Sequence, residues 1–240
     1  MICAKADLHI HTFLSPCGNI GMTPLNIVAQ AKAKGLQLIA VTDHNSTLQG
    51  PVVRQVCERE GIAVIYGAEI TTREEVHCLA YVGSEEQRVE LQHYLEKHLP
   101  HVPNNPDIFG YQLWVDEHEQ VLGEAPYLLI SAIDQGIEQV AAFVHSIEGL
   151  FVPAHIERSR NSLLSQLGFV PPGLPADALE LSRYTNPVDF CSKNATLKKY
   201  RIIQSSDAHF PGDIGTAATS FLMEKTGFAG LKTALTSTHE

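Results

Sequence analysis

Short apolar segments alternate along the chain with longer segments in which apolar side chains recur at helical spacing. The short segments are bounded by glycine, proline or polar clusters, which is typical of buried strands. We predict strands at residues 3–9, 36–41, 62–66, 76–82, 150–154, 178–181, 201–205 and 219–223. The longer segments carry helix signals, such as Thr23-Pro24 at a beginning and Gly35 at an end. We predict helices at residues 24–34, 51–60, 84–98, 133–148, 159–167, 187–199 and 227–235.

Strands that alternate with helices at this spacing indicate an α/β fold built on a parallel sheet, either open or closed into a barrel. The 240 residues match the roughly 250 residues of one α/β barrel, so we expect a single domain over residues 1–240. Residues 76–82 follow 62–66 closely enough to pair with them as a hairpin. Residues 99–126 lose the periodicity and contain four prolines and a hairpin candidate at 112–121, so we predict an insertion that forms a lid or a dimer element.

The composition argues against several classes of protein. No apolar run approaches the ~18 residues of a membrane span, and the first residues lack the apolar core of a signal peptide, so we expect a cytoplasmic protein without membrane contacts. The net charge of −10, with no run of four basic residues, predicts no stable complex with nucleic acid. The five cysteines are odd in number and unevenly spaced, which predicts reduced thiols.

Half of the twelve histidines fall at the ends of predicted strands, together with two carboxylates. An α/β barrel assembles its active site from such strand ends. In extended backbone, residues i and i+2 point to the same side, so His9-Ile10-His11 and Asp207-Ala208-His209 each present two side chains to one cavity. Imidazole and carboxylate are natural ligands of zinc, manganese and iron, and a carboxylate can bridge two ions. The pattern therefore predicts a metal site made of His9, His11, His44, Glu69, His77, His155, Asp207 and His209.

The motifs around these residues resemble those of the PHP (polymerase and histidinol phosphatase) superfamily. They are Asp7-Leu8-His9-Ile10-His11, Thr42-Asp43-His44-Asn45, Gly67-Ala68-Glu69, His77, Pro153-Ala154-His155 and Ser206-Asp207-Ala208-His209. The resemblance covers residues 7 to about 220. It implies a distorted (β/α)7 barrel that holds two or three divalent ions and hydrolyses phosphoesters. It also implies a first ion at His9, His11, Glu69 and Asp207, a second bridged by Glu69 and held by His77 and His155, and a third at His44 and His209.

One segment departs from the family pattern. Relatives often place a further His or Asp several residues after the HxH motif, where this chain reads Leu14-Ser15-Pro16-Cys17-Gly18. Only Cys17 could replace that ligand, and a thiolate favours zinc or iron over manganese. The third site is therefore either softer than usual or partly vacant, and an ordinary loop thiol is an equally supported interpretation of Cys17.

Phosphoester hydrolysis requires neutralisation of charge on the phosphate oxygens, which paired divalent ions supply while they activate a hydroxide held between them. Oxygens that do not contact metal usually meet Arg or Lys, and Arg158, Arg160 and Arg183 are the candidates, with surface charge at a helix start as the alternative. We expect Glu69, Asp207 and His209 to take part in catalysis, Asp207 or His209 by protonating the leaving oxygen. The expected substrate is a small phosphorylated metabolite or nucleotide.

Other residues and functions remain as alternatives. Asp7 and Asp43 are expected to orient imidazoles, and Glu180 either reaches the cavity or caps its strand. A metal-dependent amidohydrolase also uses an HxH motif and a late Asp, but does not need a histidine directly after the second strand. A non-catalytic metal-binding module would hold a closed four-coordinate ion, for which eight candidate ligands are too many. The native metal, the substrate and homo-oligomerisation are left open.

Overall fold

The computed structural model describes residues 1–236. All eight predicted strands and seven predicted helices lie within it, most with ends shifted by a few residues. The strands are β1 (Ile2–Ile10), β2 (Leu38–Val41), β3 (Ala63–Thr71), β4 (His77–Val82), β5 (Leu113–Val115), β6 (Val121–Glu124), β7 (Leu150–Pro153), β8 (Leu179–Leu181), β9 (Ile202–Gln204) and β10 (Thr219–Met223). The helices are α1 (Pro24–Ala33), α2 (Gly50–Arg59), α3 (Glu85–His98), α4 (Pro106–Phe109), α5 (Ile137–Ser146), α6 (Leu163–Gln166), α7 (Pro187–Lys193) and α8 (Phe228–Thr236), with 3-10 turns at Ala195–Lys199 and Pro211–Asp213.

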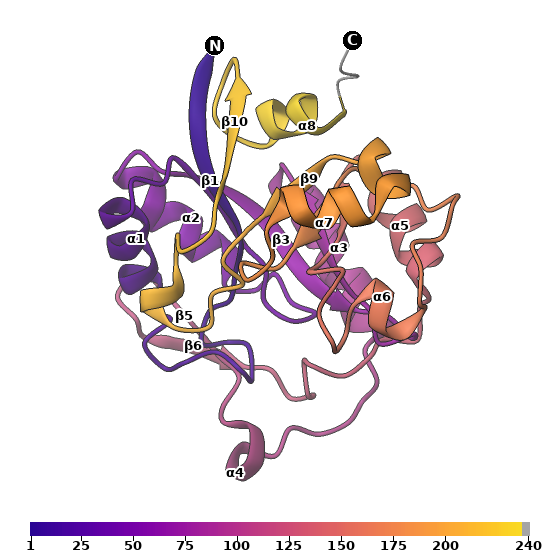
Figure 1. Cartoon of the computed structure of the whole chain (residues 1–240). Helices are drawn as coiled ribbons and strands as arrows, with labels where there is room; N and C mark the ends of the chain where they lie inside the picture. Colours follow the sequence, from indigo (N-terminus) through magenta and orange to yellow (C-terminus); the bar gives the residue numbers. More distant parts are fainter. Residues whose placement is uncertain (237–240) are drawn as a thin grey trace.

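Within residues 1–236, seven strands curl around the core as a distorted α/β barrel, in the order β1, β2, β3, β4, β7, β8, β9. Where the ladders stop, isolated backbone hydrogen bonds connect the neighbouring segments. Ile156 N donates to Glu180 O at 2.9 Å beside β7 and β8, and Ala208 N donates to His9 O at 3.1 Å between β9 and β1. The expected α/β barrel is therefore confirmed. Strand β10 pairs with β1 outside this circuit, and the two strands run side by side at the top of Figure 1.

The barrel is distorted because β4 runs against both of its neighbours. The predicted hairpin is confirmed, with Thr71 opposite His77, and the turn between them is too short to contain the crossover that a parallel strand requires. The expectation of a parallel sheet holds for β1, β2, β3 and the β8–β9 pair, and is wrong for β4 and β10. Pairing with β4 also extends β3 to Thr71, so Glu69 lies within the strand rather than after it.

Three predicted helices are shorter than their sequence pattern suggests. Helix α5 begins at Ile137, four residues later than expected, and α6 occupies only Leu163–Gln166. The predicted helix at 187–199 breaks at Asn194, whose backbone leaves the helical region (φ −123°, ψ 61°) while its side chain donates to Phe190 O. Local hydrogen bonding by the asparagine side chain thus competes with continuation of the helix.

The segment at 99–126 contains α4 and the β5–β6 hairpin, which confirms the hairpin candidate. Gln49 fastens this hairpin to the barrel, since its side-chain amide accepts from Val115 N at 2.9 Å and donates to Val115 O at 3.2 Å. Figure 1 shows the segment below the barrel, at the end where β1 and β2 finish, with α4 farthest out. Its role as a lid or dimer element stays a prediction.

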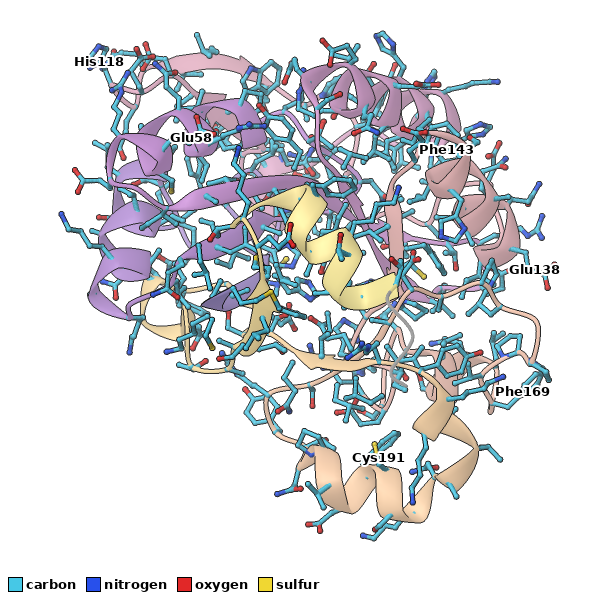
Figure 2. The ribbon with its side chains drawn as sticks, turned by 90° about the horizontal axis from the view of Figure 1, so that it is seen from above. Glu58, His118, Glu138, Phe143, Phe169 and Cys191 are labelled. Carbon is cyan, nitrogen blue, oxygen red and sulfur yellow. The ribbon has the colours of Figure 1, made fainter. Side chains whose placement is uncertain are left out.

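The opposite end of the barrel is covered by α8. Figure 2, seen from above, shows this helix lying across that end, and Leu231 and Leu235 pack with Ala4 and Leu150 in the core. All five cysteines are free, as expected, and Cys191 lies on α7 at the edge of the molecule. Among the described helices, none combines the length and the apolar character that a bilayer crossing needs.

We predict that Tyr81→Phe destabilises the protein by about 1–2 kcal/mol, because Tyr81 Oη is buried and donates to Leu8 O at 2.8 Å, which joins β4 to β1 across the interior. Tyr94→Phe is the matched control, since the buried Tyr94 Oη has no hydrogen-bond partner among the described residues. Chemical unfolding of both variants measures the difference. Equal losses of stability would contradict the importance of the Tyr81 hydrogen bond.

Candidate metal centre

A single buried carboxylate lies among five imidazole rings. Glu69 is 1% exposed, and its two oxygens lie within 3.4 Å of ring nitrogens from five histidines. The distances are 3.3 Å to His9, 3.4 Å to His11, 3.2 Å to His44, 2.9 Å to His77 and 3.0 Å to His155. Imidazoles thus contact both oxygens, so Glu69 could supply a ligand atom from either oxygen if cations were bound.

The topology explains why these side chains meet. His9 and His11 lie at the end of β1, His44 follows β2, and His155 follows β7, all at the carboxyl ends of their strands. His77 is the first residue of β4, and because β4 is antiparallel, its first residue lies at the same end of the barrel. The sequence-predicted histidines are therefore brought together, although they come from distant parts of the chain.

Asp207 lies beside the first two histidines. Its Oδ1 is 3.4 Å from His9 Nε2 and 3.5 Å from His11 Nε2. Asp207 and His155 have left-handed backbone angles, with φ of +50° and +29°. Such angles are costly for residues other than glycine and concentrate at functional sites, where surrounding bonds hold them. Here the bond from Ala208 N to His9 O, next to Asp207, fixes the loop.

A third group of ligand atoms contains the cysteine. His11, Cys17, His44 and His209 each place one ligand atom within 4.8 Å of the others. The Cys17 turn depends on its neighbour, because a Cβ on Gly18 would lie 2.1 Å from Thr12 O. Two further groups, His9-His11-Glu69 and His44-Glu69-His77, lie beside it. The three groups overlap, because His11, His44 and Glu69 each belong to two of them. The number of ions and the assignment of each ligand stay predictions.

The residues present fit divalent ions. The Nδ1 atom of His44 is buried and lies 3.2 Å from Glu69 Oε2, yet it has no hydrogen-bond partner. A buried imidazole nitrogen without a partner is costly unless it accepts a proton or binds a cation. Imidazole, carboxylate and thiol donors together are a ligand set for zinc or iron, and the imidazole and carboxylate part also suits manganese.

The buried carboxylates and imidazoles shift one another's pKa values. Burial alone would raise the pKa of Glu69 and of Asp207, but the charges of neighbouring histidines, chiefly His77 and His9 respectively, hold both pKa values well below the usual range. Burial lowers the pKa of His11, but hydrogen bonds to the two carboxylates outweigh it and raise this pKa to about 9. Burial lowers the pKa of His44. Protons on some imidazoles thus balance the two carboxylates, and metal binding would replace them.

The thiol shows the same dependence on charge. Although the Cys17 residue is exposed, its sulfur lies against the cluster, and partial loss of solvent together with the negative charges of Glu69 and Asp207 raises the pKa of the thiol above its usual value. The same carboxylates attract cations, and a bound cation reverses the effect by favouring the thiolate. Cys17 therefore suits metal binding only when the neighbouring positions are filled as well.

A layer of hydrogen bonds orients the histidines from behind. Asp43 accepts from Ser15 Oγ at 2.6 Å, and Ser15 Oγ lies 3.1 Å from His11 Nδ1. Glu180 Oε2 lies 3.0 Å from His9 Nδ1, so this residue does reach the site. Sequence reasoning missed Ser15, whose only signal is its place in the loop after HxH. Glu180 carries a stronger signal, because it is a charged residue between two leucines of a buried strand.

Asp7 holds the other side of the site. Its carboxylate accepts from Ser206 N at 2.9 Å and Gly215 N at 2.8 Å, which ties down the loop that carries Asp207. Burial raises the pKa of Asp7 to about 6, although these hydrogen bonds lower it. Asp7 therefore contacts the loop that carries Asp207 rather than a ligand, whereas Asp43 reaches His11 through Ser15.

Two of the three predicted phosphate-binding arginines reach the metal centre. Arg158 and Arg160 line its cavity, which has a volume of about 250 Å³, and Arg158 forms an ion pair with Asp207. Arg183 instead lines an adjoining cavity and pairs with Asp213 at 3.1 Å. Binding of phosphate by these arginines stays a prediction.

Comparison with solved structures gives the fold. PfuEndoQ, a lesion-specific endonuclease from Pyrococcus furiosus, has a TM-score of 0.71 at 19% identity, covering 98% of this chain and 56% of that one. A structure from Bifidobacterium adolescentis, assigned as a metal-dependent phosphoesterase, has a TM-score of 0.57 at 21% identity, covering 89% of this chain and 92% of that one. Identities this low establish a shared fold and no more.

The net charge led us to expect no stable complex with nucleic acid, and this expectation is wrong. Endonuclease Q has been solved with a 27-mer duplex carrying an abasic lesion at its active site, and that structure shares the fold with a TM-score of 0.70 at 19% identity, covering 98% of this chain and 56% of that one. A net charge of −10 is an average over the surface, whereas binding responds to the local charge of a cavity, here lined by Arg158 and Arg160.

Comparison of sequences gives the family. An uncharacterized protein of Methanocaldococcus jannaschii is 43% identical over 79 residues, which cover 29% of this chain and 46% of that protein. The chain thus spans about half the length of this relative and of PfuEndoQ. The PHP domain model matches residues 7–168, and that match contains the HxH motif, Glu69 and His155. Because it covers more than half of the sequence, this chain belongs to the PHP domain family.

Proposed function

We propose that this chain is a metal-dependent phosphoesterase. The observation that carries the proposal is that Glu69 lies among five imidazoles, with Asp207 beside them, and that both carboxylates line a cavity together with two arginines. When bound, divalent ions neutralise charge on phosphate oxygens and activate water for attack on phosphorus. The residues that would hold them are the eight predicted His, Glu and Asp ligands, with Cys17 at the third group.

We propose that Arg158 and Arg160 bind the phosphate oxygens that face away from the ligands. Both line the metal cavity, and the ion pair with Asp207 holds the Arg158 guanidinium at its wall. A guanidinium matches the geometry of phosphate oxygens and stabilises charge that develops in the transition state. Arg160 adds a second positive charge, and within residues 1–236 its guanidinium forms no ion pair.

His209 is better suited to binding metal than to donating a proton. Its Nδ1 lies 2.9 Å from the carbonyl oxygen of Asp207, which only accepts, so Nδ1 carries the proton and Nε2 is left with a lone pair. Burial and the charge of His11 lower the pKa of His209 to about 4, so the ring is neutral at pH 7. We propose that the leaving oxygen takes its proton from water in the open cavity.

The substrate we propose is a phosphorylated metabolite or a nucleotide, because the metal cavity of about 250 Å³ suits a phosphate group and a further cavity adjoins it. A second candidate is a phosphodiester within a nucleic acid. The likeness to Endonuclease Q, over 98% of this chain, favours it. Both substrates require the same hydrolysis at phosphorus.

We predict phosphate or oligonucleotide release by protein loaded with zinc, manganese or iron. The screen includes sugar phosphates, histidinol phosphate, nucleotides, a duplex with an abasic site, and cyclic amides. His9→Ala should lower activity more than about a hundredfold by removing a ligand, whereas His93→Ala on the exposed face of α3 should not. Full activity in His9→Ala would refute the site, and hydrolysis of amides alone would favour an amidohydrolase.

Metal content separates the enzyme from a structural module. We predict two or three ions per chain by elemental analysis, and loss of at least one in Glu69→Gln, which keeps the side-chain size but removes the shared charge. Glu138→Gln, on the surface of α5, is the control. A single ion in the unmodified protein, together with no turnover, would support the non-catalytic module.

Metal affinity should rise with pH. With a pKa of about 9, the His11 ring holds a proton in the metal-free protein at pH 7, and a cation must displace it. For each proton that metal binding displaces, the Kd of the metal ion falls about tenfold per pH unit. The Kd stops falling above about pH 9, where the His11 ring has already lost its proton. Competition with a chelator between pH 6 and 8 measures the slope, and a constant Kd would show that no proton is released.

A further inference from the structure

A second cavity, of about 360 Å³, adjoins the metal centre. The two cavities share four lining residues: Cys17, Arg158, Asp207 and His209. The loops after β8 and β9 form the remaining wall. A substrate whose phosphate lies at the metal ligands would therefore extend its remaining part into this second cavity, which has the size of a typical small-ligand pocket.

Two aromatic side chains line this cavity with their rings exposed. Tyr184 is 77% exposed and Phe210 is 54% exposed. The Arg183 guanidinium lies over the Tyr184 ring, 5.1 Å from its centre, and pairs with Asp213 at 3.1 Å. Arg183 therefore covers one face of the Tyr184 ring, and Asp213 neutralises the charge of this arginine. Such rings are favourable stacking partners for a planar ligand.

We propose that Tyr184 and Phe210 form an aromatic subsite that stacks on the nucleobase of a nucleotide whose phosphate occupies the metal centre. The inference rests on the proposed function and names the substrate group beyond the phosphate. Stacking of a base on an aromatic side chain contributes about 1–3 kcal/mol. The polar rest of the wall, which includes Arg158 and Asp213, suits a base with hydrogen-bonding edges and disfavours an alkyl chain.

Adenosine 5′-monophosphate and ribose 5-phosphate test the subsite, because they share the ribose and the 5-phosphate, and a hydroxyl group replaces the base in the second compound. In the metal-loaded protein, the KM for ribose 5-phosphate should exceed that for the nucleotide by about tenfold or more. Tyr184→Ala and Phe210→Ala should each reduce this ratio, and Tyr184→Phe should restore it. Phe169→Ala, at a 57% exposed ring in the loop after α6 that lines neither cavity, is the control that should leave the ratio unchanged.

The outcomes separate the subsite from the reaction. A ratio near one in the unmodified protein, or one that survives both alanine variants, overturns the subsite while hydrolysis itself upholds the phosphoesterase. If neither ester is hydrolysed, the phosphoesterase proposal fails for these substrates, and calorimetric binding of the same two compounds decides the subsite. Tighter binding of the nucleotide that is lost in both alanine variants supports it, and equal binding overturns it.

Discussion

The burial of one carboxylate among imidazoles is the constraint on which the rest of the structure depends. Glu69 is nearly inaccessible to solvent, and so are His9 and His11, so their charges cannot be compensated by water. Placing an ionised carboxylate in such surroundings costs several kcal/mol unless cations lie within reach. The hydrogen bonds of Asp43, Ser15 and Glu180 hold the rings against that carboxylate. Stability and ion binding are therefore set by the same few atoms.

Much of this arrangement can be predicted from the sequence, because strand ends and ligand-type residues coincide. The HxH and DxH motifs, His44 and His155 all follow strands with clear apolar patterns, so their convergence follows from the α/β topology. Glu69 and His77 are different. They face each other because β3 continues beyond its apolar core and β4 turns back along it, which depends on pairing between strands rather than on local pattern.

Other features depend on tertiary contacts that no local signal reports. The left-handed backbone at His155 and Asp207 is held by hydrogen bonds from distant strands. Asp and His adopt this backbone more often than most residues, but no local pattern shows at which positions they do so. The break at Asn194 follows from a side-chain hydrogen bond that competes with a helical pattern. The prediction from net charge was wrong because net charge describes the whole surface. It does not report that two arginines, Arg158 and Arg160, line one cavity.

The β3–β4 hairpin holds its site residues more firmly than the loops around the second cavity hold theirs. Glu69 and His77 are held by a continuous ladder of backbone hydrogen bonds, with Glu69 opposite Leu79 and Thr71 opposite His77. Tyr184 and Phe210, in contrast, lie on loops that only border the barrel. Insertions or exchanges in those loops would leave the ladder intact. A lineage could thus acquire new substrates by remodelling its periphery while the inherited chemistry stays in place.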